Sequence, residues 1–225
     1  MKNLKFMIPP LPWHEPIHRS EGDERVILLH GLWGTVLVME PLAKNIHEHG
    51  FETLNIPYSS FRKPLTEIVD SVADLIRGSD KKTHFVTHSM GGIVVRSLAH
   101  RYPDLVTGRI VMLAPPNQGS EIIDWLEDCP LAQWSLGPGG MNLSSERVQS
   151  EIPALASHHP LKIIMGNKAS SPFFNYLFKS EHDGIVTVSG GNLPEQDEFE
   201  VIHANHTFIP GEEEAIEKAI TFLKG

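Results

Sequence analysis

Short runs of β-branched and aliphatic residues recur along this chain, separated by longer stretches in which apolar residues follow helical spacing. Each run has the length of a strand, and runs without polar alternation are typical of strands buried on both faces. The predicted strands are 25–29, 51–56, 83–88, 109–113, 161–165 and 199–203, and the predicted helices are 39–49, 65–78, 91–100 and 212–223. This alternation predicts an α/β fold with a mostly parallel central sheet and helices on both faces.

The alternating pattern lapses between Pro115 and Leu161. This stretch contains Trp125, Trp134 and a Gly-Pro-Gly-Gly sequence at 137–140. Because a loop this long without structure is uncommon in a compact domain, we expect short helices here. A chain of 225 residues has the length of one domain. We therefore expect a single domain over residues 1–225, with a cap- or lid-like insertion at about 116–160.

Net charge and hydropathy limit the kinds of binding partner that we expect. Nineteen basic and 28 acidic residues give a net charge of -9, which repels phosphate backbones, so nucleic acid is not expected. No apolar run approaches the roughly 20 residues of a membrane span, and no transmembrane segment is expected. The expected location is the cytoplasm, although a mature secreted form would have the same composition. The sequence carries no signal for the oligomeric state.

The first motif with chemical meaning is Thr87-His88-Ser89-Met90-Gly91, between a predicted strand and a predicted helix. In a G-x-S-x-G nucleophile elbow, small residues two before and two after the serine allow the sharp turn that presents its hydroxyl above the sheet. Thr87 departs from the usual glycine. We interpret Ser89 as a nucleophile; the alternative is a serine that only caps the helix.

A serine nucleophile needs a base and an orienting carboxylate, which follow it in the order acid, then histidine, in this type of fold. Asp183 stands in a His-Asp-Gly-Ile-Val turn, whereas the acids from 195 to 200 form a charged run typical of a solvated surface. His206 falls in the loop after the last predicted strand, whereas His203 belongs to that strand. We therefore predict Asp183 as the acid and His206 as the base.

The oxyanion of an acyl-transfer intermediate needs preorganised donors. One predicted donor is the backbone N–H of Met90, at the start of the helix after Ser89. The second is the N–H of Leu32, in the His30-Gly31-Leu32-Trp33-Gly34 loop after the first long strand. The alternative interpretation of this loop is an ordinary glycine turn.

Five motifs in this order resemble the bacterial lipase and esterase branch of the α/β-hydrolase superfamily: HGLWG at 30–34, THSMGG at 87–92, LAPPNQGSE at 113–121, HDGIV at 182–186 and NHT at 205–207. The resemblance implies the α/β-hydrolase fold and a serine carboxylester hydrolase that works through an acyl-enzyme, with no metal or organic cofactor. A thioesterase or acyltransferase on the same triad, or a binding module without turnover, are the alternatives.

Apolar residues near the predicted active site suggest an ester or lipid-like small-molecule substrate with an apolar acyl group. The expected substrate contacts are Trp33 in the oxyanion loop, Trp125 and Trp134 in the insertion, and Phe173 and Phe174 in a second excursion. The alternative is that these aromatic residues pack as core.

A possible zinc motif lies near the N-terminus, where His14-Glu15-Pro16-Ile17-His18 matches H-E-x-x-H. The motif binds zinc only when a helix places both histidines on one face. Pro16 lies between them, which disfavours a regular helix. We therefore expect no metal site, and an extended segment along the edge of the sheet.

Overall fold

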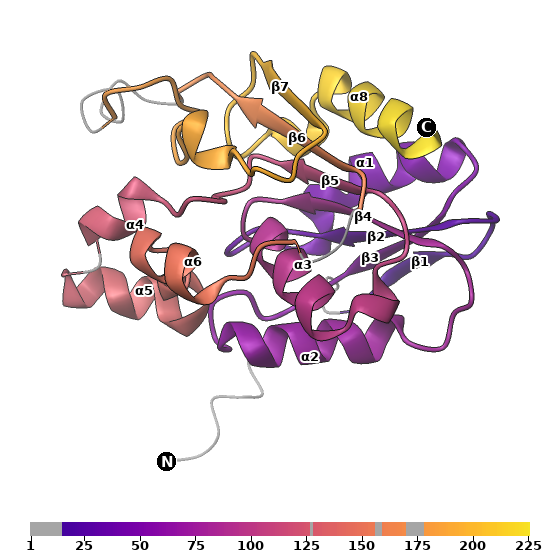
Figure 1. Ribbon diagram of the computed structural model, residues 1–225, viewed down its shortest axis with the longest axis horizontal. Helices are drawn as coiled ribbons and strands as arrows, with labels where there is room; N and C mark the ends of the chain where they lie inside the picture. The colour runs from indigo at the N-terminus through magenta and orange to yellow at the C-terminus, as the bar shows by residue number, and fades with distance from the viewer. Residues whose placement is uncertain (1–14, 127, 156–158, 170–177) are drawn as a thin grey trace, which may run out of the picture.

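The computed structural model describes residues 15–126, 128–155, 159–169 and 178–225. In these ranges one seven-stranded sheet has the order β1-β3-β2-β4-β5-β6-β7 (Figure 1). The strands are β1 (Ile17–Arg19), β2 (Arg25–Leu29), β3 (Glu52–Ile56), β4 (Thr83–His88), β5 (Ile110–Leu113), β6 (Leu161–Gly166) and β7 (Glu198–Ile202). All neighbours pair in parallel except β1, which runs antiparallel to β3. The predicted α/β class and mostly parallel sheet are confirmed.

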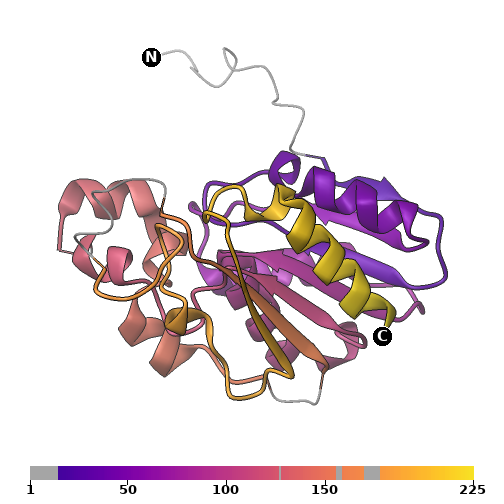
Figure 2. The same cartoon turned by 90° about the horizontal axis from the view of Figure 1, so that it is seen from above.

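Helices cover both faces of the sheet (Figures 1 and 2). Two of them, α1 (Val36–Glu48) and α8 (Glu213–Lys224), pack on one face, and α2 (Leu65–Ile76) and α3 (Met90–Arg101) pack on the other. Three short 3₁₀ helices, Pro103–Leu105, Ser189–Gly191 and Ile209–Gly211, lie in the connections.

The strands divide the core into two layers because successive side chains point to opposite faces. In β2, Val26 and Leu28 join the cluster beneath α1 and α8, whereas Ile27 and Leu29 join the cluster beneath α2 and α3. All four side chains are fully buried, which explains the unbroken aliphatic run in the sequence.

The connection from β5 to β6 forms a cap of three helices, α4 (Glu121–Leu126), α5 (Pro130–Met141) and α6 (Ser145–Glu151). In Figures 1 and 2 these helices stand together beyond one end of the sheet. Residues of these helices line a cavity together with Ser89, which directly follows β4. The parallel strands therefore end on this side of the sheet, which is its carboxyl edge. None of the described helices is long and apolar enough to cross a bilayer.

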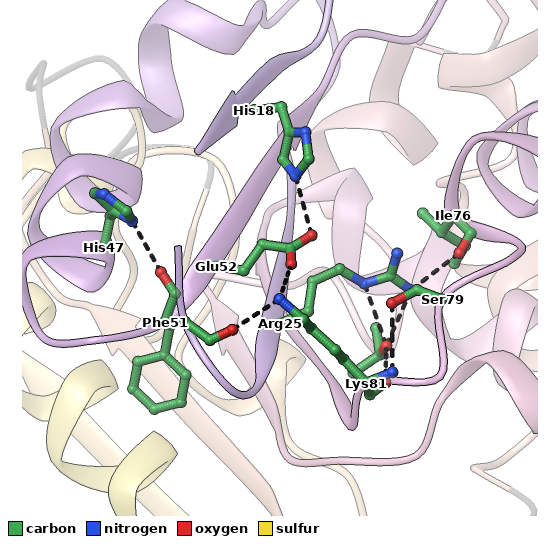
Figure 3. Close-up of polar contacts among 10 residues, drawn as sticks. His18, Arg25, His47, Phe51, Glu52, Ile76, Ser79 and Lys81 are labelled. Carbon is green, nitrogen blue, oxygen red and sulfur yellow. Dashed lines mark hydrogen bonds and ion pairs between the residues drawn. The ribbon is translucent and has the colours of Figure 1, made fainter. Parts of the chain in front are cut away.

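The opposite end of the sheet, where the parallel strands begin, is its amino edge. Charged side chains are paired there (Figure 3). Glu52 of β3 accepts hydrogen bonds from His18 of β1 at 3.0 Å and from Lys81 at 2.6 Å. The guanidinium of Arg25 in β2 donates to the carbonyl oxygen of Ile76 at 2.9 Å. His18 therefore lies on a short edge strand and not on a helix, and its bond to Glu52 ties that strand to β3. His14 is outside the described residues.

Candidate active site

Ser89 occupies a sharp turn between β4 and α3 with φ 52° and ψ -122°. A non-glycine residue with positive φ is strained, and such strain is often held at functional sites. The turn is possible because α3 packs directly on the neighbouring strand: a Cβ added at Gly91 would lie 2.5 Å from the carbonyl oxygen of Leu29. Thr87, in place of the usual glycine, fits as the buried fifth residue of β4.

The structure brings Ser89, His206 and Asp183 into one hydrogen-bonded chain, although they are far apart in the sequence. Ser89 Oγ lies 2.9 Å from His206 Nε2, and His206 Nδ1 lies 2.7 Å from Asp183 Oδ2. Because an ionised carboxylate only accepts, Nδ1 carries the proton and Nε2 is free to accept from the Ser89 hydroxyl. This is the tautomer that a general base needs. His203 is exposed, with Nδ1 3.3 Å from Asn167 Oδ1.

The Asp183 side chain is fully buried and held by its own turn. Its Oδ1 accepts from the N–H of Ile185 at 2.9 Å and of Val186 at 2.8 Å. Burial by itself would raise the pKa of Asp183, but His206 and these two N–H groups lower it below its ordinary value. The carboxylate therefore stays ionised beside the imidazole.

His88, which the sequence analysis did not single out, contacts the predicted base. Its Nε2 donates to the carbonyl oxygen of His206 at 2.8 Å. Burial, with a further contribution from His206, lowers the pKa of His88 to about 3, so its imidazole is neutral at physiological pH. The only available signal was its place directly before Ser89, which is insufficient because the contact joins residues 118 positions apart.

The predicted oxyanion loop is fixed by its own hydrogen bonds. The carbonyl oxygen of Gly31 accepts from Gly34 N at 3.0 Å and from His30 Nδ1 at 2.8 Å. The Leu32 N–H belongs to the same trans peptide and so points to the opposite side. Burial lowers the pKa of His30 to about 4, although the Gly31 carbonyl opposes this shift. His30 is therefore a neutral donor to the loop, a role that the sequence did not reveal.

The two predicted oxyanion donors belong to two segments that adjoin Ser89. A Cβ added at Gly31, the residue before Leu32, would lie 3.0 Å from Ser89 Cβ, so the loop lies directly against the serine. Met90 begins α3, and the N–H groups of a first helical turn have no acceptor within the helix. Both predicted donors therefore belong to segments next to the serine, and their role stays a prediction.

A cavity of about 430 Å³ adjoins Ser89 and His206. Most of its lining is aliphatic or aromatic, with contributions from the oxyanion loop, the cap and the Asp183 turn. The apolar side chains among the described lining residues are those of Leu32, Trp33, Val38, Pro116, Ile122, Ile123, Leu126, Leu136, Leu143, Ile185 and Val186.

The predicted substrate contacts lie at different distances from the cavity: one lines it and two do not. Trp33 lines the cavity, but Trp125 and Trp134 do not: their exposed fractions are 62% and 81%. The reason is helical geometry, because α4 and α5 turn Leu126 and Leu136 toward the cavity and the tryptophans toward solvent. Phe173 and Phe174 lie outside the described residues.

Solved structures with the same architecture include several hydrolases. A mature lipase from Bacillus licheniformis aligns with TM-score 0.76 and 17% identity, covering 93% of this chain and 96% of its own. A metagenomic carboxyl esterase aligns with TM-score 0.64 and 18% identity over 91% and 70% of the two chains. An epoxide hydrolase from Bacillus megaterium aligns with TM-score 0.59 and 14% identity over 94% and 96%. At these identities the likeness is one of fold.

Sequence comparison is more specific about the family. No curated protein sequence matches the chain at a significant level. The model of the alpha/beta hydrolase family matches residues 26–184, which is more than half of the chain and includes both Ser89 and Asp183. The chain therefore belongs to the alpha/beta hydrolase family.

Proposed function

We propose that this protein is a serine hydrolase that cleaves carboxylic esters with apolar acyl groups. The observation that carries the proposal is the hydrogen-bonded chain from Ser89 through His206 to Asp183, at a strained turn that opens on an apolar cavity. In this arrangement an otherwise weak serine nucleophile has both a base and an orienting carboxylate.

In the proposed reaction, Ser89 Oγ attacks the ester carbonyl while His206 Nε2 takes the hydroxyl proton. The N–H groups of Leu32 and Met90 stabilise the oxyanion of the tetrahedral intermediate, each by about 3 kcal/mol. The C–O bond to the alcohol then breaks, and His206 gives the proton to the departing alkoxide. Water attacks the acyl-enzyme with His206 again as base, which releases the carboxylic acid and restores Ser89.

The cavity supports an uncharged acyl group. No Lys, Arg, Asp or Glu side chain is found among the described residues that line it, so an ionised acyl chain would lose its hydration without gaining a partner. Apolar burial instead favours acyl binding by about 0.8 kcal/mol per methylene. The same chemistry would cleave a thioester, so matched oxygen and thioesters of one acyl chain distinguish the two activities.

The test uses a fluorophosphonate probe and a nitrophenyl butyrate assay. Ser89→Ala should abolish labelling and hydrolysis without unfolding the protein, because only the nucleophilic oxygen is removed. Ser120→Ala is the matched control and should keep both labelling and hydrolysis. Ser120 also lines the cavity, but its hydroxyl donates to the Ile185 carbonyl at 3.3 Å, whereas His206 is bonded to Ser89. Undiminished turnover by folded Ser89→Ala, or an inactive wild-type protein, would refute the proposal.

A further inference from the structure

A short segment after β3, Tyr58–Phe61, joins the oxyanion loop to the cap. Ser60 is buried, and its Oγ accepts a hydrogen bond from the N–H of Trp33 at 3.0 Å. Trp33 has φ 55°, a left-handed conformation that a residue with a side chain adopts only when its surroundings hold it there. The bond from Trp33 to Ser60 therefore fixes the loop one residue after the predicted donor Leu32.

The same segment also holds the start of the loop through Tyr58. The Tyr58 N–H donates to His30 Nε2 at 3.3 Å, and the two rings stack with their centroids 4.2 Å apart. The Tyr58 hydroxyl donates to the carbonyl oxygen of His30. Because His30 Nδ1 donates to the Gly31 carbonyl, the Tyr58 contacts fix both the ring and the tautomer that orient the peptide of Leu32.

On its other side the segment is in contact with α5 of the cap, through glycines. A Cβ added at Gly139 would lie 2.0 Å from the Ser60 carbonyl oxygen, and one at Gly137 would lie 2.1 Å from that of Phe61. The helix breaks at Gly137, where φ is 61°. Further along, a Cβ at Gly140 would lie 3.1 Å from Leu32 Cδ2. The glycine run thus allows α5 to pack directly on the backbone of the segment.

We propose that Ser60 is a positioning residue for the oxyanion donor Leu32, and that the packing of Gly139 on Ser60 couples the cap to this donor. The inference rests on the proposed ester hydrolysis. Ser60 and Gly139 do not line the cavity beside Ser89, so their effect on turnover would pass through the loop. The cap would then influence the chemical step even for an acyl group too short to reach it.

The first test is Ser60→Ala, assayed with nitrophenyl acetate. We expect kcat to fall about tenfold, or roughly 1.4 kcal/mol, while KM stays within twofold, because a less well-positioned donor stabilises the transition state less. Ser59→Ala is the matched control and should behave as wild type, since Ser59 does not hold the loop. Unchanged kcat in a folded Ser60→Ala protein would overturn the positioning role while leaving the proposed function intact.

Hydrogen exchange of the Trp33 amide gives a readout that does not depend on activity. Ser60→Ala should accelerate this exchange at least tenfold, and Ser59→Ala should not, because the Ser60 hydroxyl accepts a hydrogen bond from this N–H. Equal protection in both variants would overturn the proposal. If wild-type protein hydrolyses no ester, the proposed function fails, and exchange alone then decides whether Ser60 holds the loop.

Gly139→Ala tests the coupling to the cap and leaves the Ser60 hydroxyl in place. It should lower kcat on nitrophenyl acetate severalfold and accelerate Trp33 exchange, whereas Gly211→Ala, at a glycine with no heavy atom within 4 Å of an added Cβ, should do neither. The double variant with Ser60→Ala should be no more than about twofold slower than the slower single variant. Losses that multiply, or a silent Gly139→Ala, would overturn the coupling.

Discussion

The two edges of the sheet use buried polar groups in opposite ways. At the edge where strands begin, Glu52 is bonded by His18 and Lys81, and Arg25 donates to backbone and to Thr83. These contacts pair charges or close the ends of strands. At the edge where strands end, the Ser89 backbone is strained and the histidines beside it are held neutral. Polar groups at the first edge pair charges and close strand ends, whereas those at the second hold the turn and loop around Ser89, where we propose that proton transfer occurs.

Carboxylates show the same contrast. Burial would raise the pKa of Glu52, but hydrogen bonds from Lys81 and His18 lower it, so its negative charge is held by the side chains of neighbouring segments. Asp183 also has a lowered pKa, but its partners are His206 and two backbone N–H groups. An ion pair of the first kind contributes to stability, whereas a carboxylate of the second kind would stabilise the imidazolium that forms in the proposed reaction.

The largest expected effect distinguishes these two carboxylates. Asp183→Asn should lower kcat by on the order of 10³- to 10⁴-fold, because the amide cannot stabilise the charged imidazole and favours the wrong tautomer. Glu52→Gln is the matched control at the other edge and should leave kcat within twofold. Both are measured as nitrophenyl butyrate hydrolysis by protein whose folding is verified by circular dichroism. A nearly silent Asp183→Asn would mean that another acid orients the base.

The second prediction concerns acid stability. His88 and His30 have folded-state pKa values of about 3 and 4, below the ordinary 6.5, so the unfolded chain binds more protons as pH falls through 6.5. Their contribution is complete above pH 6.5 and is lost progressively toward pH 4 and 3. Between pH 7.5 and 4.5, each should remove about 2 to 3 kcal/mol from the free energy of unfolding.

Urea unfolding at the two pH values checks this, with His88→Gln as the variant and exposed His49→Gln as its control. The His88 variant should lose about 2 to 3 kcal/mol less than wild type on acidification. Burial also lowers the pKa of His84, nearer the amino edge, where Glu24 opposes the shift. A loss that is the same for wild type and His88→Gln would show that His88 is not held neutral.

The sequence is informative where a local pattern determines the structure. The runs at Arg25–Leu29 and Thr83–His88 form β2 and β4 at the predicted residues, because strands buried on both faces are rich in aliphatic, β-branched and aromatic residues. The three-residue strand Ile17–Arg19 has no such signature, since it is an exposed edge. Ser89, Asp183 and His206 were predicted from turns and motif order, and their hydrogen bonds meet that hypothesis; their catalytic roles stay a prediction.

Hydrogen bonds between segments that are far apart in the sequence could not be predicted from it. The bonds of His30 to Tyr58 and of His88 to His206 depend on how loops approach one another in three dimensions. The direction of the cap tryptophans was also hidden, because α4 spans only six residues and α5 breaks at Gly137. Hydrophobic residues in such short helices do not reveal which face is covered.

The smallest expected effect concerns the apolar cavity at the carboxyl edge of the sheet. The amino edge, by contrast, carries paired charges. Leu126 lines the cavity, whereas its neighbour Trp125 on the same helix is mostly exposed. Leu126→Ala removes about three carbons from the cavity wall. It should therefore lower kcat/KM for an octanoyl ester relative to an acetyl ester by about tenfold, or roughly 1.4 kcal/mol.

Trp125→Ala and Trp134→Ala are the matched controls and should change this ratio less than twofold, because neither side chain lines the cavity. Using the ratio of two substrates on one preparation cancels any loss of folded protein. If a tryptophan variant shifts the ratio and Leu126→Ala does not, the acyl chain lies along the outer surface of the cap. The two edges would then differ only in the hydrogen bonds among Ser89, His206 and Asp183. The apolar cavity would have a structural role, as part of the core.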